Sequence, residues 1–238
     1  MDSAIIRKVE IGDATLYQGD CLKIMPLLGE FDLALIDPPY GINYGALLRG
    51  KGDGYGNADK NGWKSYNCPE WDSERPPKTS FDLIRSISDE QIIWGGNYFT
   101  DFLPPSMRWL VWDKGQRDFS LADCEFAWSS QNKAARIFNY ARAKALQDGK
   151  QHPTQKPVAL MEWCLGLVPK AETVIDSYMG SGTCGVACVK LGRKFTGIEL
   201  DPDYFEIACQ RIEDAYKQAD LFVAPPEKPI PPKQGSFI

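Results

Sequence analysis

Histidine is almost absent from this chain of 238 residues, which contains His152 alone. One imidazole cannot build a histidine-based metal site, and the seven cysteines include no C-x-x-C pair of the kind that binds zinc. Their number is odd and several lie in apolar surroundings, which favours free thiols in a reducing compartment. We therefore expect neither a metal ion nor a disulfide scaffold.

Long apolar runs and an excess of positive charge are also missing. No apolar stretch is long enough to cross a membrane, and residues 1–8 lack the apolar core of a signal peptide. We expect a cytoplasmic protein, encoded by a bacterium or a phage. The net charge of −5 argues against a protein that coats nucleic acid non-specifically, although a local basic surface remains compatible with it. The hydrophobic content of 43% is sufficient for one α/β domain.

A short motif, Asp37-Pro38-Pro39-Tyr40, follows an apolar run at residues 31–36 that is typical of a buried strand. The motif therefore falls at the carboxyl end of a strand, where open α/β sheets bind their ligands. Its carboxylate accepts N–H groups, its prolines stiffen the backbone, and its aromatic ring offers a stacking face. These properties suit a flat substrate with an amino group, such as a nucleobase. A Pro-Pro turn with a packed tyrosine is the alternative interpretation.

Hydrophobic periodicity predicts an alternation of strands and helices along the rest of the chain. Expected strands lie at residues 5–11, 14–18, 91–94, 108–113, 124–128, 173–176 and 194–199. Expected helices lie at residues 21–28, 81–87, 158–165, 182–191 and 203–217. Asp20 is a candidate N-cap for the first of these helices, and Thr79 and Ser80 are candidate caps for the second.

Two segments carry no clear periodicity. Residues 41–78 are rich in glycine and polar side chains, which predicts a mobile lid beside the motif, or else a merely flexible insertion. Residues 131–156 contain six basic residues and one acidic residue, with aromatic residues between them. Such a segment is typical of a surface that contacts the phosphates of a nucleic acid, with Lys133, Arg136, Arg142 and Lys144 as the candidate phosphate-binding residues.

A glycine-rich turn at residues 180–185 follows a strand and opens a helix, and Glu199 lies about twenty residues further on. This spacing matches a dinucleotide-binding fingerprint, so an NAD-dependent oxidoreductase is one alternative. Asp176, four residues before the first glycine, instead favours a cationic ligand. S-adenosylmethionine has such a cationic group, a ribose for Glu199 and no phosphates.

Four segments in chain order resemble the β-class DNA amino-methyltransferases, in which the catalytic half precedes the cofactor half. They are residues 17–22, the motif at 37–40, His152-Pro-Thr-Gln-Lys-Pro157, and residues 176–183 continuing into 197–201. The resemblance covers nearly all of residues 14–217. It departs from the family's usual pattern at Ser177 and Tyr178, where Pro-Phe is usual.

The resemblance implies a Rossmann-like α/β sheet of about seven mostly parallel strands with helices on both faces, as in class I methyltransferases. It implies S-adenosylmethionine as the cofactor and double-stranded DNA as the partner, and is compatible with a homodimer. The catalytic residues would be Asp37, Pro38, Pro39 and Tyr40. The cofactor-binding residues would be Asp20, Cys21, Asp37, His152, Thr154, Lys156, Asp176, Tyr178, Gly180, Gly182, Thr183, Glu199 and Leu200.

Residues 1–220 are then expected to form one methyltransferase domain, followed by a proline-rich tail at 221–238 that is extended or disordered. Within the domain we expect a catalytic half at 14–130, a target-recognition segment at 131–150 and a cofactor half at 151–220. The first motif residue, Asp37, leans towards N6 of a flipped-out adenine in this family, with N4 of cytosine as the rival target. The recognition sequence and any restriction partner stay open.

Overall fold

The computed structural model describes residues 4–43, 72–117, 122–141, 144 and 155–222 of the chain. Its strands are β1 (Ile5–Ile11), β2 (Ala14–Gly19), β3 (Phe31–Ile36), β4 (Ser88–Trp94), β5 (Trp109–Asp113), β6 (Cys124–Ser129), β7 (Arg136–Asn139), β8 (Thr173–Asp176) and β9 (Lys194–Glu199). Its α-helices are α1 (Cys21–Ile24), α3 (Lys78–Ser86), α5 (Val158–Leu167), α6 (Thr183–Lys190) and α7 (Pro202–Phe222), with 3₁₀ turns η1 (Met25–Leu27) and η3 (Gly96–Tyr98).

All nine described strands belong to one sheet, in the order β1-β2-β9-β8-β3-β4-β6-β5-β7. The five strands from β2 to β4 in this order run parallel to one another. Antiparallel pairing occurs between β1 and β2 and on both sides of β6. The mostly parallel α/β sheet is confirmed, but the expected number of about seven strands is too low.

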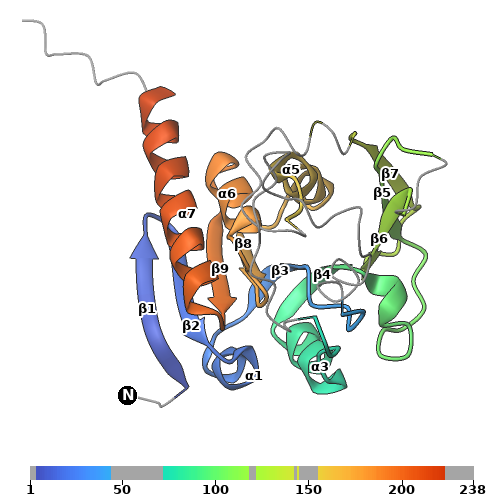
Figure 1. The fold of residues 1–238 in the computed structure, drawn as a ribbon, viewed down its shortest axis with the longest axis horizontal. Helices are drawn as coiled ribbons and strands as arrows, with labels where there is room; N and C mark the ends of the chain where they lie inside the picture. The colour runs from blue at the N-terminus through green and yellow to red at the C-terminus, as the bar shows by residue number, and fades with distance from the viewer. Residues whose placement is uncertain (1–3, 44–71, 118–121, 142–143, 145–154, 223–238) are drawn as a thin grey trace, which may run out of the picture.

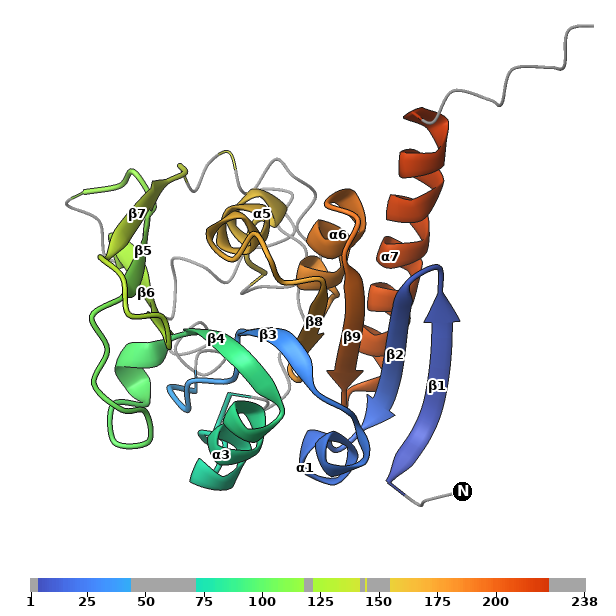
Figure 2. The ribbon, with the colours of Figure 1, turned by 180° about the vertical axis from the view of Figure 1, so that it is seen from behind.

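Helices cover both faces of this sheet. Helices α5, α6 and α7 lie on one face, and α1 and α3 lie on the other (Figures 1 and 2). Strand β3 divides its side chains between the two layers: Leu33 and Leu35 pack with α5–α7, while Ala34 and Ile36 pack with α1 and α3. This alternation explains why an uninterrupted apolar run forms a strand that is buried on both faces. Full burial of each such leucine or isoleucine contributes roughly 1.5–3 kcal/mol.

Proline decides where two of the helices break or begin. The expected helix at residues 21–28 divides into α1 and η1, because Pro26 has no N–H to donate and its ring crowds the preceding turn. Asp20 caps α1 as expected, and its Oδ1 accepts a hydrogen bond from the Leu22 N–H at 3.0 Å. The expected caps Thr79 and Ser80 were wrong: α3 starts earlier, and Pro77 occupies the N-cap position.

Two further boundaries differ from expectation. Strand β7 was not expected, because its short sequence is mostly exposed and lies within the basic segment; its parallel pairing with β5 creates it. Helix α7 was expected to end near residue 217, with a tail from residue 221, but it continues to Phe222. The remainder of the predicted tail lies outside the described residues. No helix in the described part of the chain is long and apolar enough to span a membrane.

Candidate functional site

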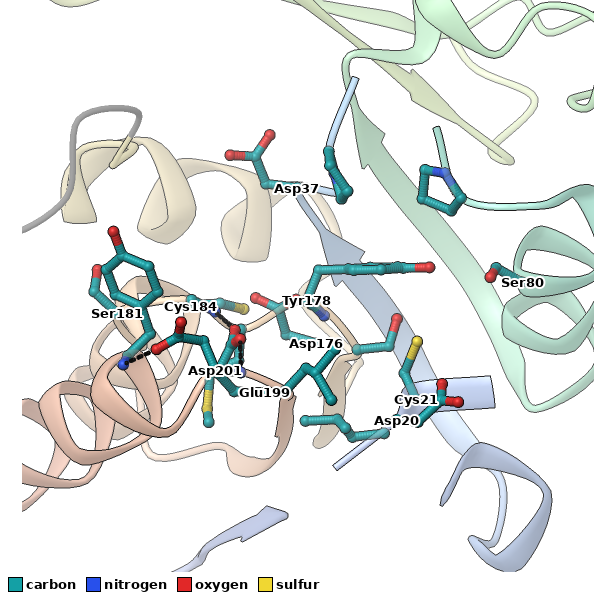
Figure 3. A pocket seen from close by; sticks show the side chains of 18 of the residues that line it. Asp20, Cys21, Asp37, Ser80, Asp176, Tyr178, Ser181, Cys184, Glu199 and Asp201 are labelled. Carbon is teal, nitrogen blue, oxygen red and sulfur yellow. Dashed lines mark hydrogen bonds between the residues drawn. The ribbon is translucent and has the colours of Figure 1, made fainter. Parts of the chain in front are cut away.

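A cavity of about 670 Å³ opens at the carboxyl ends of the parallel strands (Figure 3). Acidic residues at the ends of four strands line it: Asp20 just after β2, Asp37 just after β3, Asp176 as the last residue of β8 and Glu199 as the last residue of β9. Parallel strands end at the same edge of a sheet, so segments far apart in the sequence meet here. The cavity therefore collects most of the predicted site residues.

The β8 and β9 ends form one wall through contacts between backbone and side chain. The Glu199 carboxylate accepts hydrogen bonds from the N–H groups of Gly180 and Asp201, both at 2.8 Å. Gly180 and Gly182 have positive φ angles of 52° and 77°, which suit glycine. A Cβ on Gly182 would lie 2.9 Å from the Ala208 Cβ, so this glycine allows α6 and α7 to pack closely.

Buried carboxyl groups give this wall a marked preference for positive charge. Burial raises the pKa of Asp176 to about 8, and the nearby Asp37 and Glu199 carboxylates add to the increase. Burial also raises the pKa of Glu199. The hydroxyl of Ser177 is buried beside them and has no hydrogen-bond partner among the described residues. A ligand with a cationic group would favour ionisation of the buried carboxyls, and its hydrogen-bonding groups could pair with the Ser177 hydroxyl. S-adenosylmethionine, a nucleoside joined to an amino acid through a sulfonium sulfur, offers both.

Another part of the lining is less polar. Tyr178 extends across the cavity, and its hydroxyl end points towards Ser80 in Figure 3. Burial raises the pKa of Cys21 to about 11, so its side chain stays an uncharged thiol at neutral pH. A flat apolar group fits between such neighbours.

The predicted catalytic residues follow directly after the end of β3, where the Asp37 carboxylate accepts three hydrogen bonds. The Tyr40 hydroxyl donates to its Oδ1 at 2.6 Å. The Lys156 ammonium donates to Oδ1 at 2.8 Å and to Oδ2 at 2.7 Å, and lies 3.0 Å from the Tyr40 hydroxyl. Burial raises the pKa of Asp37, and the Lys156 charge opposes that increase.

Lys156 also contacts a second acid that the sequence did not single out. Glu125, on β6, lies 3.0 Å from the Lys156 ammonium and 2.7 Å from that of Lys114. Burial opposes ionisation of Glu125, but the two lysines lower its pKa to about 2. The resemblance assigned Lys156 to the cofactor; in the structure its ammonium contacts Asp37, Tyr40 and Glu125.

The ring of Tyr40 is packed on several sides. Tyr98 stacks on it with 4.8 Å between the ring centroids and 15° between the planes, and Phe99 meets it edge-on. The backbone of Gly95, which has a φ of 69°, also lies against the Tyr40 ring. Only glycine allows this contact, because a Cβ there would lie 2.1 Å from the ring. Tyr98 itself is 37% exposed. A second aromatic face therefore lies beside the predicted stacking residue.

Asp72 anchors the backbone of the motif. Its carboxylate accepts hydrogen bonds from the N–H groups of Tyr40 and Gly41 at 2.7 and 2.9 Å. The Asn43 N–H donates to the Asp72 carbonyl at 2.8 Å, so the two described ends of the predicted lid segment meet. Most of that segment lies outside the described residues.

The structure brings the predicted cofactor residues together with few exceptions. Lining the cavity are Asp20, Cys21, Asp37, Lys156, Asp176, Tyr178, Gly180, Thr183, Glu199 and Leu200, together with Pro39. Within the described part of the chain, Pro38, Tyr40 and Gly182 are adjacent to it rather than in its lining. His152, Thr154 and Arg142 lie outside the described residues. Of the basic candidates, Lys133, Arg136 and Lys144 are exposed.

Sequence reasoning missed Glu125, Lys114, Tyr98 and Asp72. A signal for Glu125 was present in the alternation of β6, where a glutamate shares a face with the fully buried Ala127. No group of three or more histidine, cysteine, aspartate or glutamate side chains in the described ranges could hold a metal ion.

Comparison with known proteins gives consistent matches. Residues 71–210 match a family model described as DNA methylase (N6_N4_Mtase). The type II methyltransferase M2.DpnII of Streptococcus pneumoniae is 26% identical in a match that covers 77% of this chain and 83% of that protein. M.HinfI of Haemophilus influenzae is 27% identical in a match that covers 91% of this chain and 74% of that protein.

Solved structures share the fold. The complex of M1.HpyAVI with SAM matches with a TM-score of 0.57 at 22% identity, over 83% of this chain and 99% of that one. PvuII DNA methyltransferase, described as cytosine-N4-specific, matches with a TM-score of 0.58 at 14% identity, over 90% of this chain and 95% of that one.

Proposed function

Since this chain belongs to the DNA methylase family of the N6/N4 type, we propose that it methylates N6 of adenine at a defined site in double-stranded DNA, with S-adenosylmethionine as cofactor. The observation that carries the proposal is the Asp37 carboxylate in the lining of a cavity that the buried acids Asp176 and Glu199 also line. Family membership also removes the NAD-dependent oxidoreductase from consideration.

S-adenosylmethionine, when bound, supplies an electrophilic methyl group. The residues that would hold it are those of the β8 and β9 ends, with Asp176 and Ser177 towards its charged part and Glu199 towards its ribose. Asp20, Cys21 and Tyr178 line the less polar wall, which suits an adenine. The SAM complex of the structurally similar M1.HpyAVI supports this choice of cofactor.

The target amine is a poor nucleophile, because its lone pair is delocalised into the ring of the base. Asp37 and the Pro38 carbonyl would each accept one of its N–H groups, which lets the nitrogen become tetrahedral and expose its lone pair. Correct positioning of this kind contributes up to roughly 7–11 kcal/mol to lowering a barrier. The same acceptors stabilise the positive charge that develops on the nitrogen.

The base must leave the duplex to reach Asp37, because stacked bases do not expose their reacting atoms to a pocket. Tyr40 would then stack on it. The exposed Lys133, Arg136 and Lys144, with Arg142, would bind DNA phosphates. In this proposal residues 1–220 act as one methyltransferase domain and residues 131–150 as its target-recognition segment.

Cytosine N4 is the second candidate target. The same two acceptors serve its amine equally well, and the PvuII enzyme, which shares this fold, is described as cytosine-N4-specific. Asp37 at the first motif position favours adenine on the strength of the family resemblance.

The test is incubation of the protein with unmethylated DNA and S-adenosylmethionine, followed by mass spectrometry of the nucleosides. N6-methyladenine is the expected product, and mapping of the marks would define the target sequence. N4-methylcytosine would retain the mechanism and overturn the assigned base. Absence of both products, with the cofactor bound, would overturn the proposal for DNA.

A further inference from the structure

The Asp37 carboxylate is held by an ammonium group that comes from the other half of the chain. Lys156 is 4% exposed and donates to both Asp37 oxygens. Its position is 119 residues away in the sequence, just before the start of α5. Burying a charged lysine costs free energy unless the charge is paired. The Lys156–Asp37 contact is therefore a buried ion pair that the fold depends on, unlike an ion pair on the surface.

Lys156 in turn forms an ion pair with a second carboxylate, that of Glu125. Glu125 Oε2 lies 3.0 Å from the Lys156 ammonium, and the Lys114 ammonium lies 2.7 Å from the other carboxylate oxygen, Oε1. The four side chains form a row of alternating charges, Asp37, Lys156, Glu125 and Lys114, with equal numbers of each sign. The groups facing Asp37 are Lys156 and Tyr40 in contact, and Glu125 and Asp176 at longer range.

The distribution of hydrogen bonds leaves Asp37 one well-defined acceptor direction. A carboxylate has about four lone-pair sites on its two oxygens. Oδ1 accepts from both Tyr40 and Lys156, whereas Oδ2 accepts from Lys156 alone among the described residues. An incoming N–H group would therefore bind at Oδ2. Rotation of the carboxylate away from this orientation would break three charge-assisted or short hydrogen bonds.

We propose that Lys156, anchored by Glu125, is a positioning residue that holds the Asp37 carboxylate and turns its Oδ2 towards the amino group to be methylated. The inference rests on the proposed role of Asp37 and deepens it. Lys156 acts through Asp37, and Glu125 acts through Lys156. Lys114 completes the charge balance.

Opposite effects on pH dependence distinguish the two positioning residues. Lys156 lowers the pKa of Asp37 against the effect of burial, while the Glu125 charge raises it. Loss of the lysine charge should therefore move the acid limb of the kcat profile to higher pH. Loss of the glutamate charge should not move it upward. A purely structural defect would lower activity without separating the two variants in this way.

The experiment compares Lys156→Gln, Lys156→Arg and Glu125→Gln with the wild-type protein. It measures kcat against pH at saturating DNA and cofactor, and the dissociation constant of S-adenosylmethionine by calorimetry. Lys190→Gln and Glu162→Gln are matched controls. Their side chains form an ion pair between α5 and α6 with the same 3.0 Å separation as Lys156 and Glu125, but this pair is more exposed to solvent. The melting temperature of each variant reports whether it has folded.

Lys156→Gln is expected to lower kcat by roughly 10²-fold, as a misplaced reacting group does. Its acid limb should move up by about 1–3 pH units, the usual effect of an opposite charge on a carboxyl group. Lys156→Arg keeps the charge and should keep the wild-type limb. Glu125→Gln removes a charge that lies 3.0 Å from the Lys156 ammonium. It should lower kcat roughly tenfold, as a coupling between neighbouring residues does, without an upward shift of the acid limb.

Two outcomes would overturn the inference. One is a Lys156→Gln variant with the wild-type pH profile and a loss of activity that its weaker cofactor binding fully explains. The other is a Glu125→Gln variant as active as its Glu162→Gln control. An Asp37→Ala variant tests the proposed function separately: if it is inactive while Lys156→Gln keeps the wild-type profile, the role of Asp37 stands and that of Lys156 does not.

Discussion

The two sides of the cavity are held together by different kinds of interaction. At the β8 and β9 ends, the carboxylates of Asp176 and Glu199 accept hydrogen bonds from backbone N–H groups no more than 19 residues away. At the β3 end, Asp37 is held by the side chain of Lys156, 119 residues away, which also contacts Glu125. The contacts on the first side depend on turns that follow neighbouring strands, whereas those on the second side depend on how distant segments come together across the whole sheet.

The two sides of the cavity should respond differently to amino-acid substitution. Backbone N–H groups keep their dipoles and positions in any variant that preserves the turn, so replacing one side chain on the cofactor side should remove only the interactions of that side chain. A row of paired charges depends on every member, because a single deletion leaves a buried charge without its partner. The catalytic side should therefore show larger and more specific effects.

The largest effect is expected for Asp37→Ala. Loss of the acceptor should lower kcat by at least about 10²–10³-fold, the usual effect of removing one preorganised stabilising group. The dissociation constant of S-adenosylmethionine should change far less, because Asp37 acts on the amine. Single-turnover methylation and calorimetric titration measure the two quantities. Near-normal turnover would show that the catalytic side has been assigned wrongly.

The next effect concerns Gly95, whose missing Cβ makes room for Tyr40. Gly95→Ala should displace the Tyr40 ring and lower kcat by roughly 10²-fold. Gly192→Ala is the matched control, since Gly192 also has a positive φ but no described atom lies within 4 Å of the added Cβ. Both variants should lose about 1–2 kcal/mol of unfolding free energy to the left-handed backbone. Equal kcat values in the two would contradict the packing argument.

On the cofactor side, the affinity for S-adenosylmethionine should rise with pH. Burial raises the pKa of Asp176 to about 8, so this carboxyl is mostly protonated at pH 7, and a bound cation favours its ionised form. Binding should release a proton and strengthen by up to about tenfold per pH unit between pH 6 and 8. Calorimetry in buffers of different ionisation enthalpy measures the proton release.

Asp176→Asn is the control for this pH dependence. It should bind the cofactor more weakly at pH 8 and show an affinity that changes little with pH. If the variant keeps the wild-type slope, another group carries the titration.

The smallest effects are expected on the exposed basic segment. Lys133→Ala, Arg136→Ala and Lys144→Ala should each weaken DNA binding several-fold. Each should also reduce the slope of log K against log salt by about 0.9 for every phosphate that the variant no longer neutralises. Lys170→Ala, an exposed lysine before β8, should change neither quantity. Fluorescence anisotropy at several salt concentrations measures the slopes, and unchanged slopes would place the DNA-binding surface elsewhere.

Much of the fold was predictable because its signals are local. The strands at residues 31–36, 173–176 and 194–199 were expected with the bounds that the structure shows. The first is a mainly apolar run, and the other two lie on either side of the glycine-rich turn and its helix in a recognisable motif. Strand β7 was not predictable in this way. Its sequence is mostly exposed, and only pairing with β5 makes it a strand.

The candidate site divides along the same line. Asp37, Asp176 and Glu199 were expected because each ends a strand within a recognisable motif, and all three line the cavity. Asp72 and Tyr98 could not be linked to Tyr40 from the sequence, because their contacts depend on a turn after β4 and on a segment that returns to the motif.

The sequence by itself determined where most of the strands lie along the chain, the motifs at their carboxyl ends and the chemistry that those side chains offer. These depend on residue type and short-range spacing, which a linear chain carries directly. Only the tertiary structure decided that Lys156 faces Asp37 and that Glu125 and Lys114 continue the row of charges. Electrostatic pairing acts over a few ångströms in space, so it is set by which strands lie side by side and not by distance along the chain.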